Sequence, residues 1–249
     1  MERTVRDEVA PDGSPVAVYL AMPPHDALDL VADQVPPGGL VLDLGCGVGR
    51  LANALAARGV MVTGVDAHAG MVAHLSPTVE AVRADILDLD LRRTFDVVVL
   101  ASHLVNHPTA APAYLAACRR HVRLDGAVLV ERFHPTLLDG PDEQEGEVGG
   151  VHVRHEVRDR EGGRFSASAH YTVGGRAWTQ HYEAVLLDDA AIATLLDDAG
   201  LAFVDWLDDD ARWLLAERVD AASPLRAGRG VGQRPGDAWN GSGTSGDTH

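Results

Sequence analysis

A glycine-rich turn that follows a short apolar run constrains the fold of this chain more than any other feature. The run LVLDLG (40–45) has the length and composition of a buried strand, and Gly45, Gly47 and Gly49 alternate with other residues from its end. Glycine allows left-handed backbone conformations and a close approach of the backbone to a ligand. A ligand at this turn would lie beyond the carboxyl end of the strand, where doubly wound sheets bind cofactors. The turn therefore predicts a cofactor-binding α/β fold.

Strand-like and helix-like segments alternate on both sides of this turn. Repeated β-α units of this kind predict a doubly wound, mostly parallel, seven-stranded sheet with a Rossmann-like arrangement. The predicted strands are 40–45, 60–65, 79–83, 95–101, 126–133, 201–207 and 211–219, and the predicted helices are 14–34, 50–58, 69–75, 110–121 and 189–199.

The alternation breaks after the fifth strand. An acidic, Gly-rich loop is expected at 139–150, and three stretches of alternating polarity follow at 151–159, 164–173 and 176–187. Tight Gly-containing turns join these stretches, which predicts an antiparallel β-meander. Its apolar face holds many large side chains and needs a covering partner, whereas His155, His170 and His181 are expected on solvated faces.

These patterns divide the chain into four parts. We expect an N-terminal helical segment at 1–35, and a cofactor-binding α/β domain made of 36–138 and 188–220. The meander insertion occupies 139–187, and the Gly-rich remainder, 221–249, is expected to be a disordered tail.

Composition excludes several functions. All 21 basic residues are Arg, so the chain has neither a Schiff-base lysine nor the lysine of a phosphate-binding loop. The net charge of −16 would repel a nucleic acid, which leaves a small molecule or a protein as the substrate. Two cysteines suit neither a disulfide framework nor a zinc cage, and no metal is expected. No apolar run approaches the roughly 20 residues that span a bilayer, so we expect no membrane partner and a cytoplasmic location.

Two residues beside the turn argue against a dinucleotide cofactor. Arg50 stands where the dinucleotide fingerprint needs Gly or Ala for close packing of helix and sheet. Asp43 precedes the turn, where a carboxylate would repel a pyrophosphate but would attract a cationic ligand. A dehydrogenase is therefore disfavoured.

The motif Asp43-Leu44-Gly45-Cys46-Gly47-Val48-Gly49 resembles the first cofactor motif of the class I S-adenosylmethionine-dependent methyltransferases. The resemblance extends over about residues 14–219 and implies S-adenosyl-L-methionine as the cofactor. It assigns the ribose hydroxyls to an acid at the end of the second strand, which is Asp66 here. The remaining cofactor-binding residues that it implies are Ala67, Met71, Asp85, Ile86, Ala101 and Ser102.

Two histidines are candidates for catalysis. His103 follows the fourth strand and His134 the fifth, so both should face the substrate edge of the sheet. A histidine there can take a proton from an acceptor, and the alternative is a residue that only positions the acceptor through hydrogen bonds. Alignment of the reacting atoms can supply much of the rate by itself, so many methyltransferases need no strong base when the acceptor is already nucleophilic.

The resulting hypothesis is a methyltransferase acting on an O, N or C atom of a small molecule. The alternative is an inactive S-adenosylmethionine-binding module that acts through protein contacts. The meander is expected to cover the substrate side of the site, with a homodimer interface as its competing role.

Overall fold

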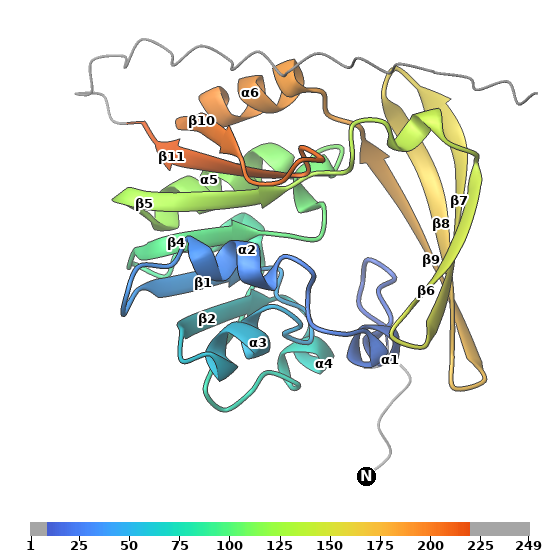
Figure 1. The fold of residues 1–249 in the computed structure, drawn as a ribbon, viewed down its shortest axis with the longest axis horizontal. Coiled ribbons are helices and arrows are strands. Elements are labelled where there is room, and N and C mark those ends of the chain that lie inside the picture. The colour runs from blue at the N-terminus through green and yellow to red at the C-terminus, as the bar shows by residue number, and fades with distance from the viewer. Residues whose placement is uncertain (1–8, 220–249) are drawn as a thin grey trace, which may run out of the picture. The chain divides into compact units, whose positions relative to one another are not determined.

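The computed structural model describes residues 9–219, so the tail expected at 221–249 lies outside the described part of the chain. Within that part, a seven-stranded sheet has the order β10-β11-β5-β4-β1-β2-β3 (Figure 1). Its strands are β1 (Leu40–Leu44), β2 (Met61–Asp66), β3 (Glu80–Arg83), β4 (Phe95–Leu100), β5 (Val122–Glu131), β10 (Leu201–Trp206) and β11 (Trp213–Arg218). β11 pairs antiparallel with both β5 and β10, and the pairs among β1 to β5 are parallel. The predicted doubly wound, mostly parallel sheet is confirmed.

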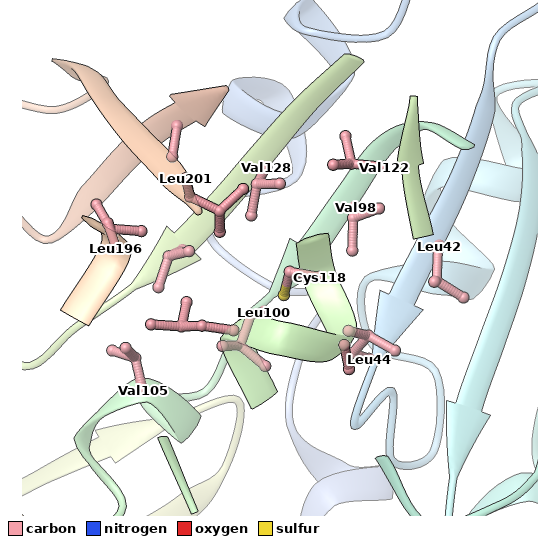
Figure 2. Packing of buried hydrophobic residues seen from close by; sticks show 14 of the residues in the cluster. Leu42, Leu44, Val98, Leu100, Val105, Cys118, Val122, Val128, Leu196 and Leu201 are labelled. Carbon is pink, nitrogen blue, oxygen red and sulfur yellow. The ribbon is translucent and has the colours of Figure 1, made fainter. Parts of the chain in front are cut away.

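Helices cover both faces of this sheet. The helices are α1 (Val16–Ala21), α2 (Leu28–Asp33), α3 (Ala52–Ala57), α4 (Ala69–Val72), α5 (Ala111–His121) and α6 (Asp189–Asp198). Val98 and Leu100 of β4 pack in the core that α5 and α6 cover, and Figure 2 shows this cluster. Val97 and Val99 point to the opposite core, which α2 and α3 cover. A strand buried on both faces reads as a continuous apolar run, which is why β4 was recognisable from the sequence.

The N-terminal segment differs from the single helical stretch predicted at 14–34. It forms two short helices, α1 and α2, because Pro23 and Pro24 interrupt the chain between them. Ser14 does not cap α1; its backbone N–H and hydroxyl both bond to Asp12 instead. None of the described helices is long and apolar enough to cross a membrane.

The insertion is a four-stranded antiparallel sheet in the order β6-β7-β8-β9. Its strands are β6 (Glu143–Val148), β7 (Val151–Glu161), β8 (Arg164–Val173) and β9 (Arg176–Val185). The last three match the predicted meander, but the expected loop at 139–150 contains the strand β6. Every residue of β6 is exposed, so the strand is held by backbone pairing with β7 and lacks the apolar alternation that reveals a strand in a sequence.

The apolar face of the four-stranded sheet is partly covered by α1. Val18 of α1 is fully buried in one cluster with Val151 and Tyr171 of the meander. Gln180 of β9 also donates hydrogen bonds from its side chain to the Ser14 hydroxyl, at 3.0 Å, and to the Asp12 carbonyl, at 3.3 Å. The N-terminal segment and the meander therefore form one packed wall beside the main sheet.

A fully buried arginine anchors the point where the chain leaves and rejoins the main sheet. Arg132 donates hydrogen bonds to the carbonyls of Leu187 and Ala211, and it pairs with Asp189 at 2.6 Å. Its guanidinium also lies over the ring of Trp206. These contacts hold Glu131 and Phe133, the two chain neighbours of Arg132, in place at the carboxyl edge of β5.

Candidate active site

The glycine turn after β1 has the left-handed conformation that its sequence predicts. Gly45, Gly47 and Gly49 have φ angles of +73°, +55° and +86°. The N–H groups of Gly45 and Cys46 both donate to the Val65 carbonyl, at 2.8 and 2.9 Å, which ties the turn to β2. A Cβ at Gly47 would meet no atom within 4 Å, so the backbone there borders open space.

Gly49 is needed for a different reason. A Cβ at this position would lie 2.6 Å from Leu75 and 2.7 Å from Asn53, inside the protein. The cofactor-binding role predicted for Gly49 is therefore not reflected in its position, and its part is to let the helix side of the turn pack closely.

Asp66, at the end of β2, supports the turn and faces the same space. One of its carboxylate oxygens accepts the Gly47 N–H at 3.0 Å, and the other accepts the His68 N–H at 2.8 Å. Burial raises the pKa of the Asp66 carboxyl above its usual value, and these two hydrogen bonds oppose the shift.

Asp43, near the end of β1, is a buried carboxylate with an unused oxygen. Its exposed fraction is 2%, and its Oδ2 has no hydrogen-bond partner among the described residues. The pKa of Asp43 is raised to about 7, with burial as the largest cause; His25 opposes the rise and nearby Asp66 adds to it. A buried carboxylate without a partner is costly, and a cationic ligand would relieve that cost.

These residues line a cavity of about 460 Å³, within the size range of small-molecule sites. Every predicted cofactor residue except Gly49 lines it. Those residues are Asp43, Gly45, Gly47, Asp66, Ala67, Met71, Asp85, Ile86, Ala101 and Ser102. Among them, Met71 and Ile86 are buried, and Asp85 is exposed and accepts the Leu87 N–H at 2.9 Å.

A second cavity, of about 450 Å³, adjoins the first. Four residues line both cavities and so form their common wall: Tyr19, His25, Arg50 and Ser102. The second cavity is also lined by residues that follow β4 and β5 and by the meander. Its further lining residues include His103, Glu131, Phe133, His134, His155, Tyr171, Tyr182 and Arg212.

Both histidines predicted as catalytic candidates lie in the second cavity. His103 has a left-handed backbone, with φ at +59°, and its ring stacks on Phe133 with centroids 4.1 Å apart. Burial lowers the pKa of His103, which favours the neutral ring. Within residues 9–219, its Nδ1 atom has no hydrogen-bond partner. The Nδ1 atom of His134 lies 2.8 Å from the Thr136 hydroxyl and accepts the Thr136 N–H at 3.2 Å.

Several charged or titratable residues of this cavity were not predicted as site residues from the sequence, among them His25, Asp26, Glu131, Asp142 and Arg212. Glu131 carried one usable signal, since it is a charged residue at the carboxyl end of an apolar strand. The expectation that His155 lies on a solvated face is wrong. In β7 it falls on the same side as Val153 and Val157, so the register turns it into the cavity.

Comparisons with known proteins agree with this geometry. Residues 41–126 match a family described as a methyltransferase domain. The chain is similar to the cypemycin N-terminal methyltransferase of a Streptomyces species, with 34% identity over 133 residues, which cover 44% of this chain and 54% of that protein. The matched region thus spans about half the length of this relative.

Two further likenesses come from actinobacterial proteins. A dTDP-3-amino-3,6-dideoxy-alpha-D-glucopyranose N,N-dimethyltransferase of Streptomyces fradiae is 29% identical over 172 residues, covering 64% of this chain and 67% of that protein. The structure of SAM-bound CalS10, an amino pentose methyltransferase from Micromonospora echinaspora, aligns with a TM-score of 0.61 and 23% identity. That alignment covers 78% of this chain and 89% of CalS10, and it shows that the two share a fold.

Proposed function

We propose that this chain, which has the fold and the domain of the class I S-adenosylmethionine-dependent methyltransferases, methylates an amine nitrogen of a small molecule. The observation that carries the proposal is the pair of adjoining cavities with a common wall. One cavity has the features that the cofactor requires, and the other is lined by groups that suit a cationic acceptor.

The first cavity fits S-adenosylmethionine in its charges and in its shape. The unpartnered oxygen of Asp43 and the carboxylate of Asp66 suit a ligand that carries positive charge and sugar hydroxyls. The open space beside Gly47 admits a ligand against the backbone. When bound, the cofactor supplies a methyl group on a positively charged sulfur.

The second cavity favours an amine among the O, N and C acceptors that the sequence left open. Glu131 and Asp142 supply carboxylates, while Tyr171, Tyr182 and Phe133 supply aromatic surface. Carboxylates and aromatic faces both attract ammonium groups. Two of the three similar proteins named above are an N-terminal methyltransferase and an amino sugar N,N-dimethyltransferase, and both names describe methylation of nitrogen.

The wall of the second cavity supports a substrate-selecting role for the meander. Strands β6 to β9 contribute five residues to the lining of this cavity: Gln144, His155, Val157, Tyr171 and Tyr182. His103 and His134 stay candidates for contact with the acceptor from the opposite side. The homodimer and the cytoplasmic location stay predictions.

A panel of paired acceptors tests the proposal. The full chain is incubated with S-adenosylmethionine and either the amino sugar nucleotide named for the Streptomyces fradiae relative or a short peptide with a free N-terminal amine. The matched controls carry an N-acetyl group on the same nitrogen. We expect a mass increase of one methyl group and release of S-adenosylhomocysteine with the free amines only. Methylation of the acetylated controls, or binding of the cofactor without turnover on any acceptor, would contradict the amine assignment.

A further inference from the structure

A buried carboxylate lines the second cavity, which is proposed to hold the acceptor and is named the acceptor cavity. The side chain of Glu131 is only 4% exposed. Its Oε2 atom accepts the Ser102 N–H at 2.7 Å, and its Oε1 atom lies 4.0 Å from Nδ1 of His103. Glu131 lines the cavity, so its carboxylate can contact a ligand there.

His25 connects this buried carboxylate with an exposed one. Its Nε2 atom lies 3.6 Å from Oε2 of Glu131, and its Nδ1 atom lies 3.0 Å from Oδ1 of Asp26. The side-chain exposure rises along this series from 4% for Glu131 to 10% for His25 and 67% for Asp26. Nε2 thus faces a carboxylate in the cavity and Nδ1 faces one at the surface. Nδ1 also lies 3.3 Å from the Ala27 N–H, which donates to it when Nδ1 carries no proton.

We propose that Glu131, His25 and Asp26 form a proton-exit path that carries a proton from the acceptor amine to solvent. This inference rests on the proposed function, because an amine enters as an ammonium ion and must lose a proton before its nitrogen can attack. The ammonium gives this proton to Glu131, which passes it to Nε2 of His25. The proton on Nδ1 then passes to Asp26 and on to water, and the freed electron pair forms the new bond to the methyl carbon as the carbon–sulfur bond breaks.

The charged groups around His25 agree with this assignment. The hydrogen bond from His25 is the largest cause that lowers the pKa of Asp26, so this carboxylate stays ionised and orients the ring. Arg212 lies 3.5 Å from the other oxygen of Asp26. Arg50 and His103 line the same cavity, and the electrostatic effect of His25 extends to Asp43 in the cofactor cavity. Arg212 and His25 both keep Asp26 ionised, so a proton that reaches Asp26 is released to water and is not retained.

The same three side chains each offer one potential metal ligand atom, and these atoms lie within 4.8 Å of one another. A bound metal ion accounts for the arrangement of these three side chains less well than proton transfer between them does. A metal ion is held by one imidazole nitrogen, whereas here the two nitrogens of His25 face different carboxylates. The guanidinium of Arg212 beside Asp26 would also repel a divalent cation.

Substitution of the central residue provides the sharpest test. The assay uses the free amine that the wild-type protein methylates. In His25→Gln we expect kcat for this amine to fall by about 100-fold at pH 7, within the usual range for acid–base catalysis. The deficit should shrink to less than about 5-fold near pH 10, because bulk solvent then deprotonates the amine and replaces the path. Added imidazole should restore part of the activity of His25→Ala. A residue that only supports the fold would give a deficit that does not depend on pH and is not rescued.

Two variants separate the roles of the carboxylates. Glu131→Gln should raise the KM for the amine as well as lower kcat, since Glu131 contacts the ammonium. Asp26→Asn should lower kcat alone and with the same pH dependence as His25→Gln. The control is Asp29→Asn, since Asp29 is a nearby exposed carboxylate that pairs with Arg58 on the surface. Cofactor affinity by calorimetry and the melting temperature show whether each variant is folded.

The outcomes distinguish this inference from the function on which it rests. If the wild-type protein methylates no amine, the proposed function and the exit path both fail. If it methylates an amine while His25→Gln loses activity equally at every pH, the exit path alone is overturned. Loss of wild-type activity on chelation, restored by a divalent cation, would also overturn it in favour of a metal site.

Discussion

The unpaired carboxylate of Asp43 makes a quantitative prediction about stability. Replacement of Asp43 by Asn removes the ionisable group and keeps the size of the side chain. The pKa of Asp43 is raised from 3.8 to about 7, with burial as its largest cause. At about 1.36 kcal/mol per pH unit, this rise corresponds to about 4 kcal/mol between the two protonation states.

The sign follows from proton binding in the two states. Between about pH 4 and pH 7 the folded state keeps the proton on Asp43, whereas the unfolded state has lost it. Folding is therefore favoured at low pH by this group, and its contribution is lost as the pH rises through the folded pKa. At pH 8 the ionised Asp43 should lower the free energy of unfolding of the wild-type protein by the full amount. The Asn variant has no ionisable group at this position and should not be destabilised in this way.

Urea unfolding of the cofactor-free chain between pH 5 and pH 8 measures the effect. We expect Asp43→Asn to be more stable than wild type by about 2–4 kcal/mol at pH 8 and by at most about 1–2 kcal/mol at pH 5. Calorimetry should show weaker cofactor binding by the same variant. Asp85→Asn is the control, because Asp85 lines the same cavity but is exposed. A stability difference between wild type and Asp43→Asn that is the same at both pH values would refute the reasoning.

Three other changes probe the two cavities. Asp66→Ala should weaken S-adenosylmethionine binding by about 1–3 kcal/mol by calorimetry, since a charged acceptor is lost and the Gly47 N–H loses its partner; unchanged affinity in a folded variant would argue against the assignment. Gly47→Val should stay folded but lose cofactor binding, whereas Gly174→Val, with a similar φ in an open turn, should keep it. Replacing 140–186 by a Gly-Ser linker should abolish acceptor turnover without changing cofactor affinity or oligomeric state; a dimer that becomes a monomer with turnover retained would favour the interface role instead.

The sequence could predict which residues come together in the first cavity because these residues lie in short segments of the chain. Asp43, the glycines and Asp66 lie at the ends of neighbouring strands, and the parallel order of β1 and β2 brings them together. Gly49 does not line this cavity, and the sequence could not separate it from Gly45 and Gly47, because a glycine that permits packing and one that borders a ligand look alike in a sequence. The two kinds of glycine are distinguished only by the folded structure, in which Leu75 and Asn53 lie beside Gly49.

The acceptor cavity was less predictable because distant segments build it. His25 follows α1, Glu131 ends β5 and Arg212 precedes β11, so no short motif contains them. His155 was misplaced because a polar residue on the inner side of a strand looks solvated until the register is known. β6 was missed since an exposed edge strand has no buried side chains to give a periodic pattern.

Both cavities depend on buried carboxylates, and His25 links them. Asp43 in the first cavity and Glu131 in the second are each almost fully buried, and His25 acts on both through its charge or its contacts. Two cationic ligands side by side would repel each other, so a site that binds both needs negative charge beside each one. Loss of one proton through His25 also removes one of the two positive charges before the transfer. On the proposed function, the same arrangement would let the two ligands bind together, and it accounts for a cost in stability at neutral pH when they are absent.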